Sequence, residues 1–208
     1  MGEAKTIPRK TRIQAHNEEL ILKAALEVFS AYGFRGATVD QIAANCGLSK
    51  PNLLYYFRRK EDIYVAVLEH TLHDWLEPLR SLDPQGEPIA EITRYIRTKI
   101  RLSRDNPKAS RLFANEILHG ATAVGEYLKG PLKALVDDKA AIIRGWIAEG
   151  RLNPIDPHHL IFAIWATTQH YADFEPQVSA VTGNPPDLMD TAEETLTRLF
   201  VEGLRPRA

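Results

Sequence analysis

From Thr38 to Tyr64 the chain reads TVDQIAANCGLSKPNLLYYFRRKEDIY, and this stretch decides the fold of its front part. It opens with a threonine that is followed three residues later by Gln41, which is the pattern of a capping box. In a capping box the threonine hydroxyl caps the first amides of a helix, and the glutamine side chain reaches back to the backbone. The pattern predicts a short helix over residues 39–45.

A second short helix follows after a tight turn. Gly47 breaks the first helix, because glycine readily adopts the left-handed conformation that ends helices. Ser49 is the expected N-cap of the next helix, and Pro51 fits its first turn, where a missing N–H costs nothing. That helix is predicted over residues 49–56, behind a longer amphipathic helix over residues 17–33. Three helices in this order predict a helix-turn-helix.

The second short helix carries side chains that suit contact with DNA. Leu53 and Phe57 are four residues apart and share the face that packs inward. Lysine meets phosphates or guanine edges, asparagine pairs with adenine, and tyrosine hydroxyls reach phosphates. A generic helical hairpin, with half-buried tyrosines and solvated arginines, is the alternative. Within a DNA-binding head over residues 17–63, the candidate contact residues are Thr38, Ser49, Lys50, Asn52, Tyr55, Tyr56 and Lys60.

The distribution of charge separates the front of the chain from the rest. The 208 residues carry a formal net charge of −1, but the first sixty carry +5 and the remainder −6. A basic front on an acidic body suits a front that meets a polyanion such as double-stranded DNA. A chance asymmetry of solvated charge is the alternative. Residues 1–16 are polar and basic without helical periodicity, and they predict a flexible arm.

Composition bounds the class of protein. Apolar residues make up 44% of the chain, which is enough to build a core. Cys46 is the only cysteine, so no disulfide forms within one chain, and the chain begins without the apolar segment of a signal peptide. No apolar run approaches the ~20 residues that span a bilayer. We therefore expect a cytoplasmic protein without membrane contact.

The remainder of the chain, residues 64–208, predicts a larger helical bundle for ligand binding and dimerisation. Helical periodicity continues without an alternating strand pattern, so the expected fold class is all-α. There is no phosphate-binding glycine loop, nucleophile elbow or metal-ligand spacing, so we expect neither an enzyme nor a cofactor or metal. The expected helices cover residues 61–79, 89–104, 107–119, 122–150, 157–173 and 187–203.

The last two expected helices are the most apolar. The run HHLIFAIWATTQHYADF, which ends at Phe174, is apolar on almost every side, more than one buried face requires. The last helix carries an apolar stripe through Leu196, Leu199 and Phe200. Two such helices from each subunit would form a four-helix interface, so we expect a homodimer through them. A deeply buried core of a monomer is the alternative.

A wider pattern in the head is carried by Phe29, Gly33-Phe34, Thr38, Ile42-Ala43, Gly47, Ser49-Lys50, Leu53, Tyr55-Tyr56-Phe57 and Lys60-Glu61. This pattern resembles the DNA-binding domain of the TetR family. The resemblance implies a dimeric, all-helical, ligand-responsive transcription regulator, mainly a repressor, that reads a near-palindromic operator. It also implies phosphate contacts for Thr38, Tyr55 and Lys60, and positions nearest the bases for Lys50 and Asn52.

Two positions depart from the common family pattern. The chain has Pro51-Asn52 where the family often has Gly-Thr, and Leu54 where a tyrosine is common. The body segments SRDNPKASRLFANEILHGA, residues 103–121, and PIDPHHLIFAIWATTQHYADFEPQVSAVTG, residues 154–183, resemble the pyrimidine-utilisation regulators of the same family. That resemblance implies uracil or thymine as the effector that releases operator DNA.

A small planar effector needs an aromatic surface and an amide that matches its N–H and C=O edge. Trp165 and Gln169 lie four residues apart on one helix face, and Trp75, Phe113 and Asn115 offer the same chemistry elsewhere. Tryptophans that only fill the core are the alternative. Two competing functions are a relative that senses another small aromatic or amphipathic molecule, and a ligand-binding or enzymatic bundle with a purely structural head.

Overall fold

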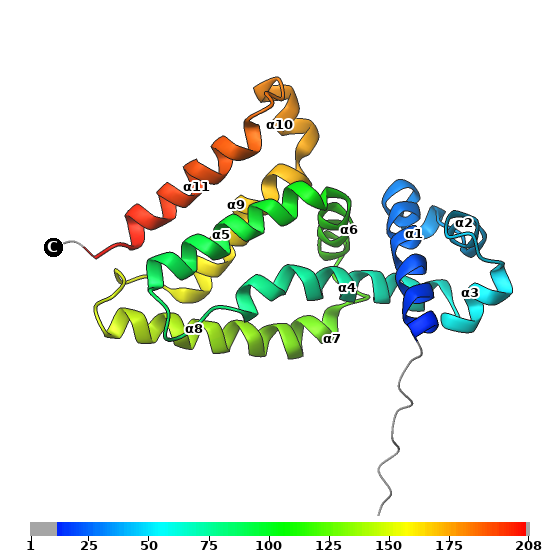
Figure 1. Cartoon of the computed structure of the whole chain (residues 1–208), viewed down its shortest axis with the longest axis horizontal. Helices are drawn as coiled ribbons and strands as arrows, with labels where there is room; N and C mark the ends of the chain where they lie inside the picture. Colours follow the sequence, from blue (N-terminus) through cyan, green and yellow to red (C-terminus); the bar gives the residue numbers. More distant parts are fainter. Residues whose placement is uncertain (1–11, 207–208) are drawn as a thin grey trace, which may run out of the picture. The chain divides into compact units, whose positions relative to one another are not determined.

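A computed structural model describes residues 12–206, and every regular element in that range is helical (Figure 1). The predicted all-α fold class is therefore confirmed. The elements are α1 (Arg12–Gly36), α2 (Val39–Asn45), α3 (Lys50–Tyr56), α4 (Lys60–Arg80), α5 (Pro88–Asp105), α6 (Pro107–Leu118), α7 (Gly125–Tyr127), the π-helical turn η1 (Leu128–Leu132), α8 (Lys133–Ala148), α9 (Pro157–Asp173), α10 (Glu175–Thr182) and α11 (Leu188–Leu204).

The chain divides into two compact units between Val67 and Leu68. We call the unit up to Val67 the head and the unit from Leu68 the body. The boundary lies four residues after the predicted one, inside α4, so this helix begins in the head and ends in the body. The flexible arm expected over residues 1–16 lies mostly outside the described residues. Its last part is helical instead, because α1 already begins at Arg12.

The core of the head is aromatic where α1 meets α4. Phe29 of α1 is 1% exposed, and the Tyr64 ring packs edge-on against it with centroids 5.0 Å apart. Phe34 lies 4.9 Å from the same tyrosine ring. Gly33 makes this possible, since its φ of 66° kinks α1 and turns Phe34 back onto the core. α1 also packs on α2, and α2 packs on α3.

The helix-turn-helix forms as its capping residues predict. The Gln41 amide donates to Thr38 Oγ1 at 3.2 Å and Gln41 Oε1 accepts from the Thr38 amide at 2.8 Å, which completes the capping box. Gly47 takes the left-handed conformation, with φ of 70°. Ser49 Oγ accepts from the Asn52 amide at 3.3 Å and caps α3. The local signals therefore specify both short helices and the turn between them.

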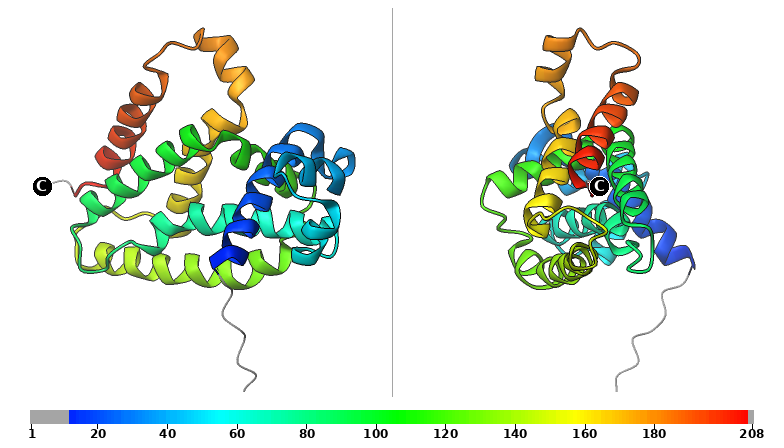
Figure 2. Two further views of the ribbon diagram at one scale, coloured as in Figure 1. Left: turned by 45° about the vertical axis from the view of Figure 1, so that its right-hand side comes forward. Right: turned by 90° about the vertical axis from the view of Figure 1, so that its left-hand side faces the viewer.

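Within the body, α5 and α9 are the central helices. α5 packs against both α9 and α11, and α9 packs in addition against α6 and α8, as two further views show (Figure 2). The apolar side chains between them include Ile96 and Ile164, which are at most 1% exposed. α5 and α9 therefore contribute the centre of the apolar core of the body.

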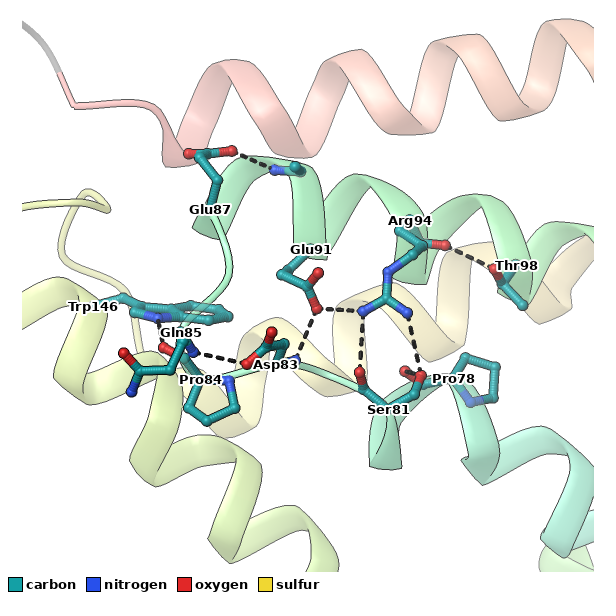
Figure 3. A network of polar contacts seen from close by, with 11 residues as sticks. Pro78, Ser81, Asp83, Pro84, Gln85, Glu87, Glu91, Arg94, Thr98 and Trp146 are labelled. Atoms are coloured by element: carbon teal, nitrogen blue, oxygen red, sulfur yellow. Dashed lines mark hydrogen bonds and ion pairs between the residues drawn. The ribbon is translucent and has the colours of Figure 1, made fainter.

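A polar network holds the connection between α4 and α5 (Figure 3). Trp146 of α8 donates from Nε1 to the carbonyl of Pro84 at 3.0 Å, and Glu91 accepts from the amide of Asp83 at 2.8 Å. Arg94 donates to the carbonyl of Ser81 at 3.1 Å and also contacts Glu91. The buried Trp146 is thus satisfied by the loop and fixes the start of α5.

Two parts of the body differ from the prediction. The helix expected over residues 122–150 is interrupted by η1, because Pro131 has no N–H to donate to the helical ladder. α10 was not predicted, since the expected helices covered residues 157–173 and 187–203 and left the residues between them unassigned. Pro176 in the first turn and Gly183 at the left-handed C-cap, with φ of 72°, are the signals of this helix.

Candidate DNA-binding and effector sites

The outward face of α3 presents the side chains expected to meet DNA. Leu53 is fully buried and anchors α3, whereas Tyr55 is 72% exposed and Asn52 is exposed. Tyr56 is different, because its hydroxyl accepts from Asn17 Nδ2 at 2.7 Å and ties α3 to α1. Ser49 is exposed, but its hydroxyl caps the helix. The surface of α3 that is open to a partner is centred on Asn52 and Tyr55.

Lys60 already donates hydrogen bonds to backbone carbonyls within the head. Its Nζ donates to the carbonyl of Phe34 at 2.7 Å and to the carbonyl of Ala37 at 2.9 Å. The same ammonium lies 4.5 Å from the centroid of the Phe34 ring. An ammonium has three protons, so one remains for a phosphate. Lys60 therefore joins α4 to the end of α1, a structural role that the sequence pattern does not predict.

Two other charged side chains at this surface form exposed ion pairs. Lys50 Nζ lies 2.8 Å from Asp40 Oδ2, and Arg59 lies 2.9 Å from Asp62 Oδ1. Pairs this exposed contribute little to stability, and they exchange readily for other partners. Thr38 is exposed, with its hydroxyl engaged in the capping box. A phosphate that approaches Lys50 would compete with the carboxylate of Asp40.

The interior of the body contains an unexpected line of polar side chains on α5. Tyr95, Lys99 and Ser103 follow one another at intervals of four residues, so they share one helix face. All three are at most 3% exposed. We call these residues the polar line of α5.

Lys99 is the most unusual member of the polar line. Its Nζ lies 4.2 Å from the centroid of the Trp75 ring, a cation–π contact with α4. Burial lowers the pKa of the Lys99 ammonium to about 7, and the negative charge of Asp173 opposes that shift. No ion pair joins Lys99 to a carboxylate among residues 12–206. A titratable amine therefore lies inside the body without an ion pair in the described part of the chain.

The neighbours of Lys99 are polar as well. Trp165 Nε1 donates to the hydroxyl of Tyr95, and burial raises the pKa of that tyrosine. Ser110 of α6 donates to Asp173 of α9, whose pKa is raised by burial against the effect of this hydrogen bond. The Ser103 hydroxyl is 1% exposed and has no hydrogen-bond partner within the described part of the chain. Such an orphaned polar atom requires an explanation.

The residues expected to line an effector pocket divide into three groups. Trp75 is 5% exposed and contacts Lys99, and Trp165 is half-buried and contacts Tyr95, so the structure brings both indoles to the polar line. Gln169 and Phe113 are half-buried, and within residues 12–206 no hydrogen bond, ion pair or ring contact joins them to the polar line. Asn115 is exposed and is not part of this interior. Lys99 and Ser103 were not predicted, although their spacing from Ile92, Ile96 and Ile100 places them on the buried face.

A groove of about 390 Å³ reaches the polar line from outside. Ser103 is one of its lining residues, together with Tyr171 of α9, Val178 of α10 and Met189 of α11. Ser103 thus lies where the groove meets α5, and its hydroxyl oxygen is buried behind that surface. This volume is in the range of small-molecule sites.

The helices expected to form a dimer interface expose part of their apolar surface. On α9, Phe162 is 48% exposed, and Phe174 at its C-terminal end is 51% exposed. Leu199 of α11 is 62% exposed. Leu160, Ile164 and other residues of the opposite face are buried in the body core. These helices therefore have one face in the core and one apolar face open.

Residues 12–206 contain neither a candidate membrane-spanning helix nor a candidate metal site. No helix there has the length and apolar character needed to cross a membrane. No group of three or more histidine, cysteine, aspartate or glutamate side chains in the same range could hold a metal ion.

Comparison with known proteins gives the same division into head and body. Residues 21–67 match the family model described as bacterial regulatory proteins, tetR family, and residues 68–207 match the YcdC-like protein, C-terminal region. The HTH-type transcriptional regulator RutR of Escherichia coli K12 is 49% identical over 209 residues, which cover 99% of both chains. The repressor NicS of Pseudomonas putida is 39% identical over 66 residues, 30% of this chain and 31% of NicS.

Solved structures share the fold at lower identity. The structure of a TetR-like transcriptional regulator from Rhodococcus sp. RHA1 matches with a TM-score of 0.66 and 22% identity over 93% of this chain and 96% of that one. Apo AibR matches with a TM-score of 0.70 and 17% identity, over 92% and 99% of the two chains. Both halves of the chain match family models and a full-length relative is 49% identical, so the chain belongs to the TetR family of helix-turn-helix transcriptional regulators.

Proposed function

We propose that this protein is a cytoplasmic, homodimeric repressor of pyrimidine metabolism that leaves its operator when uracil or thymine binds inside the body. The observation that carries the proposal is the full-length similarity to RutR together with an interior that suits a small polar ring. A line of buried donors and acceptors next to two indoles favours a planar heterocycle over a purely aliphatic effector.

The head would bind DNA with α3 in the major groove. A dimer would place one α3 in each of two successive grooves of a near-palindromic operator. Lys50 and Asn52 would lie nearest the bases, and Tyr55 and Lys60 would hold phosphates on either side. Thr38 would meet a phosphate through the amides at the start of α2, since its hydroxyl is engaged in the cap.

The dimer would form through α9 and α11. Their exposed apolar side chains, such as Phe162 and Leu199, would be covered by the same two helices of the second subunit. A symmetric interface of this kind buries the same patch on both subunits. The expected solution state is a dimer.

The coupling between effector and operator requires a helix that belongs to both units. α4 begins in the head and ends in the body, and its body part carries Trp75 beside Lys99. An effector that alters the position of Trp75 would change the equilibrium between head arrangements. A typical coupling free energy of about 1–3 kcal/mol would weaken operator affinity roughly 5- to 150-fold.

The test is a mobility-shift experiment on operator fragments that the protein itself selects from random-sequence DNA. We expect a shift at low salt that is reversed by uracil and by thymine, and that weakens steeply with added salt. A shift that neither pyrimidine reverses would rule out the proposed effector. Absence of any selected sequence would rule out operator recognition by the head.

A further inference from the structure

We propose that Lys99 and Ser103 form the polar anchor of the effector site and select a neutral, planar ligand by its carbonyl oxygens. The inference rests on the proposed function in one respect, namely that the body interior holds the effector. It goes further in assigning the chemical class of ligand and two residues that recognise it.

The first step is the state of Lys99 without a ligand. Its ammonium is 2% exposed and contacts the face of Trp75, but it has no carboxylate in ion-pair distance within residues 12–206. An unpaired charge in a protein interior is costly, and a leucine or methionine would be cheaper for folding. A donor of this kind is retained where a ligand supplies the missing acceptor, and a carbonyl oxygen is such an acceptor.

The second step is Ser103, one helical turn further along the same face. Its hydroxyl is buried with no hydrogen-bond partner among residues 12–206, and the residue lines the groove that enters between α5, α9 and α11. A ligand that enters this groove would meet Ser103 first, and Lys99 lies one helical turn before Ser103 on the same face of α5. The two residues are separated by about 6 Å of helical rise, so their side chains leave successive turns of the same face.

The third step is the net charge of the interior. Asp173 acts electrostatically on Lys99 and is held by Ser110, and Arg111 of α6 lies 3.8 Å from Glu175. The positive and negative groups around the polar line therefore balance. An anionic ligand would gain from Lys99 but meet Asp173, and a cationic ligand would meet Lys99. A neutral ring with carbonyl oxygens meets neither penalty.

The fourth step is the role of the indoles. The face of Trp75 holds the Lys99 ammonium in place, and Trp165 is fixed by its hydrogen bond to Tyr95. Both indoles therefore border the polar line with apolar ring surface. That surface accommodates a flat ligand better than a branched one. The two donors favour carbonyl oxygens and the indoles favour a flat ring, so a lactam or imide ring is the ligand that suits both.

The test uses calorimetric titration and thermal shift on the full-length protein with uracil, thymine, hydantoin and the anionic ring orotate. Lys99→Met is expected to weaken uracil binding at least ~10-fold, because a charge-assisted hydrogen bond is lost. Ser103→Ala is expected to weaken it a few-fold. Lys139→Met is the matched control, since Lys139 is also buried, with 9% of its surface exposed, but pairs with Asp138 at 3.3 Å. Orotate is expected to bind more weakly than uracil.

A second measurement separates loss of the anchor from loss of folding. The melting temperature of ligand-free Lys99→Met is expected to equal or exceed that of the wild type, because a buried charge is removed. Equal binding of a neutral ring by wild type and Lys99→Met would overturn the inference, as would tighter binding of orotate than uracil. If hydantoin binds through Lys99 and the pyrimidines do not, the proposed effector is wrong and the anchor stands. If no ring binds the wild type, both are wrong.

Discussion

The head and the body arrange their polar side chains in opposite ways. In the head, an apolar residue such as Leu53 is fully buried, and the side chains available to a partner, such as Tyr55, lie outside. In the body, Lys99 and Ser103 lie inside, while apolar residues such as Leu199 are exposed. Polar side chains on the outside of the head can contact a long charged polymer such as DNA. Polar side chains inside the body can contact only a small molecule that the protein encloses. The two regions should therefore respond differently to similar mutations.

The largest expected effect is the loss of the head by a core substitution that leaves the body intact. Leu53→Ala should destabilise the head by about 2–5 kcal/mol, because it removes three carbon atoms from a fully buried site. DNA binding in a mobility-shift assay should be lost, while uracil binding measured by calorimetry should persist. The control is Leu20→Ala, since Leu20 is 38% exposed and should change stability by less than about 1 kcal/mol.

Loss of uracil binding in Leu53→Ala would show that head and body do not fold independently. In that case the head and the body would unfold together as a single cooperative unit.

The second prediction concerns the dependence of effector binding on pH. Only the protonated amine of Lys99 can donate to a carbonyl as an ammonium, and its pKa without ligand is about 7. Affinity for uracil should therefore fall as the pH rises from 6.5 to 8.5, by up to ~10-fold per pH unit above that pKa. Lys99→Met should give a flat profile over this range in calorimetric titrations.

The pKa of Lys99 also has a consequence for folding. The pKa of the buried amine lies below the ordinary value of 10.5, so the folded protein binds fewer protons than the unfolded chain between about pH 7 and 10.5. Stability should rise with pH in that window as the penalty of the buried charge disappears. Asp173 and Tyr95, the other titratable groups at this site, have pKa values raised by burial. A profile unchanged by Lys99→Met would assign the pH dependence to another group.

The sequence predicted the head better than the body interior because the signals of the head are local. Thr38 and Gln41, or Ser49 and Asn52, are three residues apart and can be paired by inspection. The partners of Lys60 are 26 and 23 residues away, so its backbone contacts could not be predicted by inspection.

The polar line of α5 was missed for a different reason. The segment RYIRTKIRLSR is rich in basic residues, and a lysine among arginines suggests a solvated face. Helical phase gives the opposite answer, because Lys99 lies three residues after Ile96 and one before Ile100, inside the apolar stripe. The partners Trp75 and Asp173 come from α4 and α9, so only the fold brings them to Lys99. The sequence therefore predicts that Lys99 lies on the buried face of the helix, but it does not predict which side chains contact it.

The third prediction tests the double role of Lys60. Lys60→Met should destabilise the head by about 1–3 kcal/mol, because the carbonyls of Phe34 and Ala37 lose a charged donor. Operator affinity should fall equally for all operator sequences, since a phosphate contact carries no base preference. Thermal unfolding and mobility shifts measure the two effects. Lys23→Met, which removes an exposed charge of α1, should leave stability nearly unchanged.

The smallest expected effect is a change at the surface of the head alone. Tyr55→Phe removes one hydroxyl from a side chain that is 72% exposed, so folding stability should change by less than about 0.5 kcal/mol. Operator affinity should weaken by about 0.5–1.5 kcal/mol, uniformly across operator variants, if the hydroxyl donates to a phosphate. The control is Tyr32→Phe, an exposed tyrosine of α1 that is 59% exposed. A Tyr55→Phe effect confined to one base position would mean that Tyr55 reads a base, and the assignment of phosphate and base contacts on α3 would then be reversed.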